Sequence, residues 1–322
     1  MQTLLTSKSF GFKVEEPLVL ECGETLRDLR IQYTTWGDLS ADKSNVVWIF
    51  HALTANSDPS EWWENFFPEG SPINPAKDFI VCANVLGSCY GSTEPKGFDF
   101  PLITIRDIVE AHKRLKDHLG IEKISLGIGG SLGGQQLLEW AVQEPDLFEV
   151  IVPIATNAKH SAWGIAFNEA QRMALRADPI NGLETARAIA MLSYRHYDTY
   201  EVTQTDQDGR KDNFSASSYQ RYQGEKLSKR FSPYSYYFLS KAMDSHDVGR
   251  HFGGVEKALN RIQSRTITIG LDTDILFPIH EQEFLTQHIS NSSLHVISSL
   301  YGHDGFLIET EQINDILKKE LQ

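Results

Sequence analysis

The chain has 322 residues, of which 41% are hydrophobic and 23% charged, a composition typical of a globular enzyme rather than a disordered protein. Its formal net charge of −13 offers no electrostatic attraction to nucleic acid or to an anionic membrane. No apolar run approaches the roughly 20 residues that a membrane-spanning helix needs.

Cysteine usage and the N-terminus bear on the cellular compartment. Cys22, Cys82 and Cys89 lack regular spacing, which argues against a disulfide framework or a zinc site, and we expect no bound metal. The first residues lack the basic stretch and apolar block of a signal peptide. We therefore predict a cytoplasmic protein.

Short apolar runs recur along the chain. Leu18–Glu21 and Leu29–Thr35 flank Gly23 and partly alternate in polarity, which predicts an antiparallel hairpin. Later runs are rich in Val and Ile and have the length of buried strands. These runs are Val46–Phe50, Phe79–Asn84, Ile124–Ile128, Val150–Ile154 and Thr266–Gly270.

Helical patterns separate most of these runs. The clearest is Thr104–Leu119, whose apolar residues follow i, i+3, i+4 spacing. Thr104 and Asp107 resemble a capping box, and Gly120 ends the helix. Alternation of strands and helices predicts an α/β fold with a mostly parallel sheet covered by helices on both faces.

The alternation stops between Ser161 and Arg261, where polar helical stretches and the polar loop Thr203–Asn213 replace the strand signal. It resumes at Thr266. We therefore predict a core domain of residues 1–160 and 262–322, interrupted by a helical insertion of residues 161–261 that forms a lid. The alternative is a second structural domain with no role in gating.

The strongest motif is Gly129-Gly130-Ser131-Leu132-Gly133, which fits G-x-S-x-G between a strand pattern and a helix pattern. A nucleophilic serine on a tight turn needs small neighbours, since side chains there would collide with the backbone. The N–H of Leu132, at a helix N-terminus, is a candidate oxyanion donor. A purely structural glycine-rich turn is the alternative.

An α/β-hydrolase fold places its catalytic acid and then its histidine downstream of the serine. Asp272 and Asp274 both follow the strand pattern that begins at Thr266, and position alone does not choose between them. His303 lies on a glycine-flanked loop before the last helix pattern and is the candidate base for Ser131.

His51 is the rival histidine, because it follows the strand Val46–Phe50 directly. This fold places the second oxyanion N–H in that loop. We therefore expect His51 to shape the loop and the N–H of Leu53 to serve as the second oxyanion donor.

Together these motifs make the chain resemble the homoserine O-acetyltransferase family of methionine biosynthesis, within the α/β-hydrolase superfamily. The resemblance covers most of the chain. It rests on His51-Ala-Leu-Thr54, Asn84-Val-Leu-Gly87, Gly91-Ser-Thr93, Phe100-Pro101, Thr104-Ile-Arg-Asp107, Gly129-Gly-Ser-Leu-Gly-Gly134, Leu138-Glu-Trp140, Ala166-Phe-Asn168, Gln171-Arg172, Tyr194-Arg195, Ser245-His-Asp-Val-Gly-Arg250, Asp274-Ile-Leu-Phe-Pro278 and Tyr301-Gly-His-Asp-Gly-Phe306.

The resemblance implies further roles. The family's Asp-x-Leu-Phe-Pro pattern falls on Asp274, which makes it the acid. Asp304 would pair with the ammonium group of L-homoserine, and Arg187 with Tyr194 would meet its carboxylate. The family implies acetyl-CoA as co-substrate, a ping-pong route through an acyl-serine, no permanently bound cofactor, and a homodimer formed through the insertion.

Two loops depart from the family's pattern. Glu94 stands where the family has glycine, and Lys96–Asp99 is a shortened connection. The segment Ala55–Ser60 also diverges. We expect both loops near the mouth of the site. Rival functions are a homoserine O-succinyltransferase or serine O-acyltransferase, an esterase, and a binding protein on an inactive hydrolase scaffold.

Overall fold

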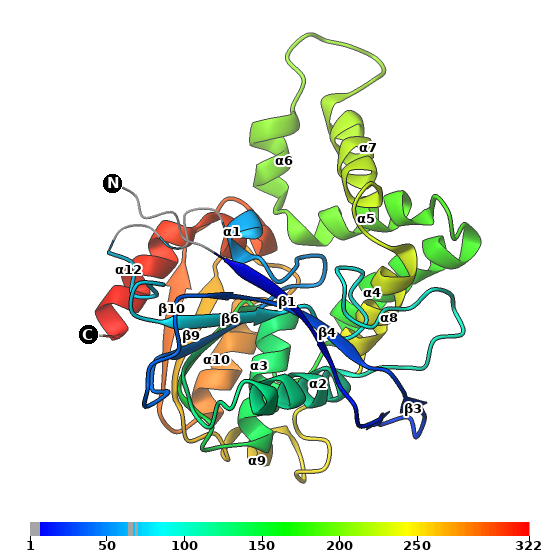
Figure 1. Ribbon diagram of the computed structural model, residues 1–322. Helices are drawn as coiled ribbons and strands as arrows, with labels where there is room; N and C mark the ends of the chain where they lie inside the picture. Colours follow the sequence, from blue (N-terminus) through cyan, green and yellow to red (C-terminus); the bar gives the residue numbers. More distant parts are fainter. Residues whose placement is uncertain (1–6, 64–66, 68–69, 322) are drawn as a thin grey trace.

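An eight-stranded sheet forms the centre of the molecule in the computed structural model, which describes residues 7–63, 67 and 70–321 (Figure 1). The strand order is β1-β4-β6-β5-β7-β8-β9-β10. The strands are β1 (Lys8–Lys13), β4 (Arg30–Trp36), β5 (Val46–Phe50), β6 (Phe79–Ala83), β7 (Ile124–Gly130), β8 (Phe148–Ile154), β9 (Arg265–Leu271) and β10 (Ser292–Ile297). Residues 1–6, where a signal peptide would begin, lie outside the described residues.

The sheet is parallel from β6 to β10, whereas β1 and β4 pair antiparallel at one edge. Both faces of the central strands are buried: in β5, Val46 and Trp48 belong to one apolar cluster and Val47 and Ile49 to the other. Continuous apolar runs are what a sheet buried on two faces requires. The predicted α/β-hydrolase fold class is confirmed.

The N-terminal hairpin was predicted wrongly. Leu18 does not pair with the strand that contains Leu29–Thr35; β2 (Leu18–Val19) instead pairs with β3 (Thr25–Leu26) in a separate small sheet. The partner of β4 is β1, in the register Lys8 with Thr35. β1 was overlooked because most of its residues are exposed, so its sequence lacks an apolar run.

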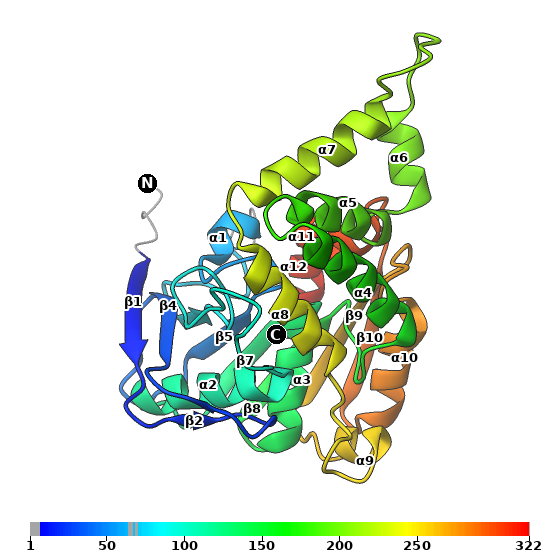
Figure 2. The same ribbon diagram turned by 90° about the vertical axis from the view of Figure 1, so that its right-hand side faces the viewer.

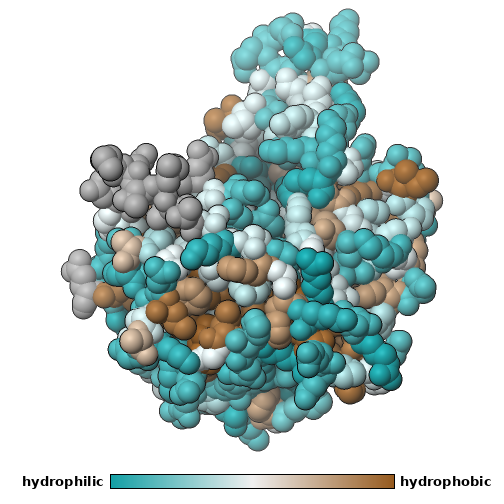
Figure 3. All heavy atoms as spheres, in the orientation of Figure 1, coloured by the Kyte–Doolittle hydropathy of each residue, from teal (hydrophilic) through white to brown (hydrophobic). Residues whose placement is uncertain are grey.

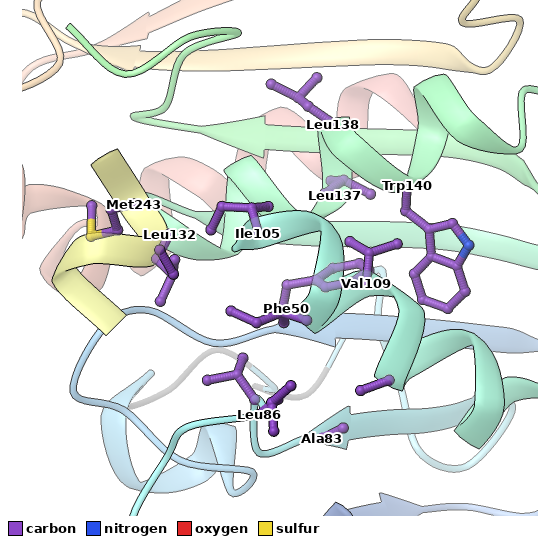
Figure 4. Close-up of a cluster of buried hydrophobic side chains, with 14 of the residues drawn as sticks. Phe50, Ala83, Leu86, Ile105, Val109, Leu132, Leu137, Leu138, Trp140 and Met243 are labelled. Atoms are coloured by element: carbon purple, nitrogen blue, oxygen red, sulfur yellow. The ribbon is translucent and has the colours of Figure 1, made fainter. Parts of the chain in front are cut away.

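Helices cover both faces of the sheet. The helices of the core are α1 (Pro59–Trp62), α2 (Ile105–His118), α3 (Leu132–Gln143), α10 (Ile279–His288), α11 (Gly305–Ile308) and α12 (Thr310–Glu320), with the 3₁₀ helix η1 (Gly302–Asp304). The capping box at Thr104 and Asp107 starts α2 as predicted. Figure 4 shows how side chains of β5, α2 and α3, among them Phe50, Val109 and Trp140, gather in one cluster.

The elements between β8 and β9 are all helices, and loops join them. The insertion contains α4 (Ala162–Ala177), α5 (Gly182–Tyr194), α6 (Tyr197–Gln204), α7 (Ser215–Ser228), α8 (Pro233–Asp244) and α9 (Val255–Leu259). In both ribbon views α6 and α7 project from the molecule (Figures 1 and 2), and their tip is strongly hydrophilic (Figure 3). By contrast, Met243 of α8 packs in the cluster that contains Leu132 (Figure 4). The insertion is thus anchored close to the start of α3.

In the described part of the chain, no helix combines the length and apolarity needed to cross a membrane.

Candidate active site

Ser131 lies at the junction of β7 and α3, on a strained turn. Its backbone has φ 56° and ψ −123°, a conformation that L-residues rarely adopt. A side chain at Gly129 would lie 2.6 Å from the carbonyl carbon of Gly133, and one at Gly133 would overlap the Phe50 carbonyl oxygen. Only glycine permits the turn that lifts the serine hydroxyl off the sheet.

A chain of hydrogen bonds links Ser131 to His303 and Asp274. His303 Nε2 lies 2.9 Å from Ser131 Oγ, and His303 Nδ1 lies 2.7 Å from Asp274 Oδ2. The backbone N–H groups of Leu276 and Phe277 donate to Asp274 Oδ1 at 2.8 and 2.9 Å, which fixes the carboxylate. All three side chains are buried. This arrangement can pass a proton from serine to histidine.

Asp272, the other candidate acid, is used elsewhere. Its Oδ1 accepts a hydrogen bond from the backbone N–H of Ser299 at 3.1 Å, between the ends of β9 and β10. The two aspartates are only two residues apart, yet Asp274 alone meets the histidine. Of the two aspartates, Asp274 is therefore the one placed to orient the imidazole of His303.

Two backbone N–H groups are candidates for an oxyanion hole. Leu132 is the first residue of α3, so its N–H has no acceptor within the helix. Leu53 follows β5 and lines the same pocket as Ser131. A carbonyl oxygen held between them would be polarised by both donors.

His51 organises the loop that carries Leu53. Its Nε2 accepts a hydrogen bond from the Val85 N–H at 3.0 Å, and its Nδ1 donates to the Ala52 carbonyl at 2.8 Å. Burial lowers the pKa of His51 to about 4, so the ring is neutral at physiological pH. These contacts are those of a residue that shapes a loop.

A pocket of about 450 Å³ opens above Ser131. It is lined by both the core and the insertion. The lining residues are Ala52, Leu53, Thr54, Ala55, Asn56, Glu61, Trp62, Tyr90, Ser131, Arg187, Tyr194, Lys226, Arg230, His303, Asp304, Phe306 and Leu307. Of the eight site residues predicted from the sequence, all except Leu132 and Asp274 line this pocket.

Arg187 and Tyr194 share one side of the pocket. Both belong to α5, and the Arg187 guanidinium carbon lies 5.3 Å from the centroid of the Tyr194 ring. The Tyr194 ring in turn lies 5.7 Å from the His303 ring. Burial raises the pKa of the Tyr194 hydroxyl, so this group is a hydrogen-bond donor. Arg187 therefore lines the pocket and does not lie on a solvated face of the helix.

Asp304 also lines the pocket, but it already has a cationic neighbour. Arg195 Nε lies 3.0 Å from Asp304 Oδ2. Arg195 belongs to the Tyr194-Arg195 motif, from which no role was predicted for it. The pairing joins residues 109 positions apart, which no local pattern signals.

Arg230 and Lys226 were also overlooked. Arg230 Nη1 donates to the Thr54 carbonyl at 2.6 Å and lies 2.7 Å from the Tyr90 hydroxyl. Lys226 is on α7, four residues earlier. In residues 7–63, 67 and 70–321 neither cation forms an ion pair. The sequence alone carries no signal for these two residues, because only the fold shows that they lie at the pocket.

The two divergent loops have different positions. Ala55 and Asn56, in the segment Ala55–Ser60, line the pocket as expected. The shortened connection Lys96–Asp99 is not among the residues that line the pocket, and its expected position near the mouth stays a prediction. Its Phe98 packs on the rings of Tyr234 and Tyr237 of α8, at centroid distances of 5.1 and 4.9 Å. The connection is occupied in anchoring the insertion.

Among the described residues, no three side chains of His, Cys, Asp or Glu are grouped so as to hold a metal ion.

The chain is similar to known proteins over most of its length. Residues 45–310 match the family model of the alpha/beta hydrolase fold. The chain is 49% identical to the homoserine O-acetyltransferase of Cyclobacterium marinum, over 95% of this chain and 93% of that protein. It is 43% identical to the homoserine O-acetyltransferase of Chlorobaculum parvum, over 97% and 94%.

Solved structures give the same result. The crystal structure of homoserine O-acetyltransferase from Staphylococcus aureus superposes with a TM-score of 0.86 at 27% identity, covering 98% of this chain and 96% of that one. Esterase E22 superposes with a TM-score of 0.87 at 20% identity, over 97% and 100%, which shows a shared fold alone. The chain belongs to the homoserine O-acetyltransferase family, a family of acyltransferases with the α/β-hydrolase fold.

Proposed function

We propose that this enzyme transfers an acetyl group from acetyl-CoA to the hydroxyl of L-homoserine, a step of methionine biosynthesis. The hydrogen-bonded series Ser131–His303–Asp274, opening into a pocket that also contains Arg187 and Asp304, carries the proposal. A nucleophile beside a cation and a carboxylate suits an amino acid that accepts an acyl group.

The first half-reaction acylates Ser131. His303 Nε2 takes the hydroxyl proton while Ser131 Oγ attacks the thioester carbonyl, and the N–H groups of Leu53 and Leu132 stabilise the oxyanion. The carbon–sulfur bond then breaks, and His303 returns the proton to the departing thiolate. Asp274 holds the imidazole in the tautomer that both transfers need.

The second half-reaction moves the acetyl group to the acceptor. The homoserine carboxylate binds Arg187 and the Tyr194 hydroxyl, and its ammonium binds Asp304. His303 takes the proton of the acceptor hydroxyl, whose oxygen attacks the carbonyl carbon of acetyl-serine. The bond between that carbon and Ser131 Oγ then breaks, and His303 gives the proton to Ser131 Oγ. Placing the hydroxyl against the ester gives it a large effective concentration over water.

Lys226 and Arg230 support a donor that carries phosphates. They are cations at the pocket rim, and among the described residues the hydrogen-bond partners of Arg230 are neutral oxygens. A coenzyme A donor presents several phosphate charges outside the acyl group, and cations at the entrance would bind them. The enzyme then needs no permanently bound cofactor.

We also propose a cytoplasmic homodimer that contacts through the insertion, which would serve as a lid. Large apolar side chains on α6 and α7 are exposed, such as Tyr197 and Val202, each at 70%, and Tyr222 at 56%. Exposed apolar side chains on a projecting element favour a partner surface. Sedimentation equilibrium tests the dimer.

A donor–acceptor matrix tests the activity. Acetyl-CoA and succinyl-CoA are each mixed with L-homoserine or L-serine, and thiol release and product mass are followed. We expect acetyl-CoA with L-homoserine to be fastest. Faster turnover of succinyl-CoA or L-serine would replace the substrate assignment, and release of thiol without any acceptor at the same rate would indicate an esterase.

A further inference from the structure

The loop that carries His303 is braced by the insertion. Gly302 has φ 61°, and a side chain there would lie 2.8–3.0 Å from backbone atoms of residues 194–196. Thr199 Oγ1 donates a hydrogen bond to the Leu300 carbonyl. The segment of residues 194–199, where α5 ends and α6 begins, is therefore packed directly against the backbone of residues 300–302.

Arg195 is the charged member of this contact. Its guanidinium carbon lies 5.2 Å from the centroid of the Tyr301 ring, and its Nε lies 3.0 Å from Asp304 Oδ2. Both side chains of the ion pair are largely buried, with 17% and 13% of their surfaces exposed. Solvent screens such a pair much less than one on the surface. Arg195 thus contacts the residues on both sides of the segment Gly302–His303.

The two oxygens of Asp304 are in different situations. Arg195 Nε forms an ion pair with Oδ2, although the pair lacks hydrogen-bond geometry, and in the described part of the chain no hydrogen bond reaches Oδ1. Asp304 lines the pocket and Arg195 does not. A carboxylate held through one oxygen from behind leaves the other oxygen for a cation that enters the pocket.

We propose that Arg195 is a positioning residue that sets the enzyme's selectivity for acceptors with an ammonium group. It holds the Asp304 carboxylate in one rotamer through Oδ2, so that Oδ1 is already placed to bind the amino group of the acceptor. This assignment rests on the proposed function for the identity of the acceptor. A preorganised charge recognises its ligand at a lower entropic cost than a mobile one.

The proposal separates selectivity from catalysis. The hydrogen bonds of His303 run to Ser131 and Asp274, and neither involves Arg195. Loss of Arg195 is therefore expected to weaken use of the ammonium group more than acylation of Ser131. A purely structural role in bracing the loop would impair every step that uses His303, whichever acceptor is offered.

The experiment compares L-homoserine with 4-hydroxybutanoate, which is homoserine without its amino group. The ratio of kcat/KM for the two acceptors is measured in the wild type, Arg195→Met and Arg195→Lys. We expect Arg195→Met to lower this ratio about tenfold. Arg195→Lys, which keeps the charge, should recover much of it. The burst of p-nitrophenol from p-nitrophenyl acetate should stay within about threefold of wild type.

Arg176→Met is the matched control. Arg176 also lies in the insertion and also pairs with a carboxylate, that of Glu169, but it is away from the pocket. Its ratio should equal that of the wild type. Should Arg195→Met fail to fold, Arg195→Gln takes its place with the same expected ratio.

Equal losses with both acceptors, or a lysine variant no better than methionine, would overturn the role of Arg195. A wild type that transfers nothing to L-homoserine would contradict the proposed function instead. The two failures are therefore distinguishable.

Discussion

The nucleophile side and the acceptor side of the pocket are built in different ways. Ser131 and its turn come from five consecutive residues that span the junction of β7 and α3, with two glycines that sterics demand. The acceptor side combines α5 of the insertion with Asp304 of the core. The first is a local device fixed by backbone geometry, and the second depends on tertiary packing. Chemistry and acceptor choice can therefore be altered separately.

The largest effect should come from Ser131→Ala, which removes the nucleophile and leaves the acceptor side intact. We expect transferase activity to fall by a factor on the order of 10⁴ or more, with no acetyl group on the protein. Mass spectrometry after an acetyl-CoA pulse reports the acyl-enzyme directly. A stable acetylated species in this variant would show that another residue is the nucleophile.

Acid should destabilise both regions at once. Burial lowers the pKa of His51 and His112 to about 4 in the core, and that of His160 to about 4 and His246 to about 3 where the insertion joins it. An unfolded histidine titrates near 6.5, so below that pH the unfolded chain binds protons that the folded chain does not.

The free energy of unfolding is therefore expected to fall as the pH drops from about 6.5 to about 4, by up to about 1.4 kcal/mol per pH unit for each histidine. These groups have no such effect above that range. Urea unfolding at pH 7.5 and 5.5 measures the loss, in one transition for core and insertion. Two separate transitions would mean that the regions unfold independently.

Arg187→Met isolates the acceptor side. Removing the guanidinium should lower kcat/KM for L-homoserine about 100-fold, because the substrate carboxylate loses its charged partner. The p-nitrophenol burst from p-nitrophenyl acetate should change little. If acylation and transfer fell together, the two sides of the pocket would not be separable.

The smallest effect belongs to the pocket rim. Arg230→Met should raise KM for acetyl-CoA by about tenfold and weaken its salt dependence, while turnover of uncharged p-nitrophenyl acetate is retained. Lys226→Met should act in the same direction, more weakly, since a lysine lacks the planar fork of arginine. An unchanged KM for acetyl-CoA in the double variant, Arg230→Met with Lys226→Met, would mean that these cations do not bind the donor.

The same division explains what the sequence could predict. The strands β5 to β9, the capping box of α2 and the turn at Ser131 follow from apolar runs, caps and glycine spacing, which are local signals. The ion pair of Arg195 with Asp304 and the cations at the rim depend on how α5 and α7 sit over the sheet. The edge strand β1 was not predicted for a related reason, because an exposed strand has little apolar pattern in its sequence.

The backbone at Ser131 has a consequence for how this protein tolerates change. A residue held at φ 56° and ψ −123° costs on the order of 1–3 kcal/mol unless it is glycine. Selection for thermal resistance alone would thus favour glycine at this one position and yield a sturdier, inert protein. The most strained residue is the one whose hydroxyl the reaction needs, so mutational searches for stability must hold it constant.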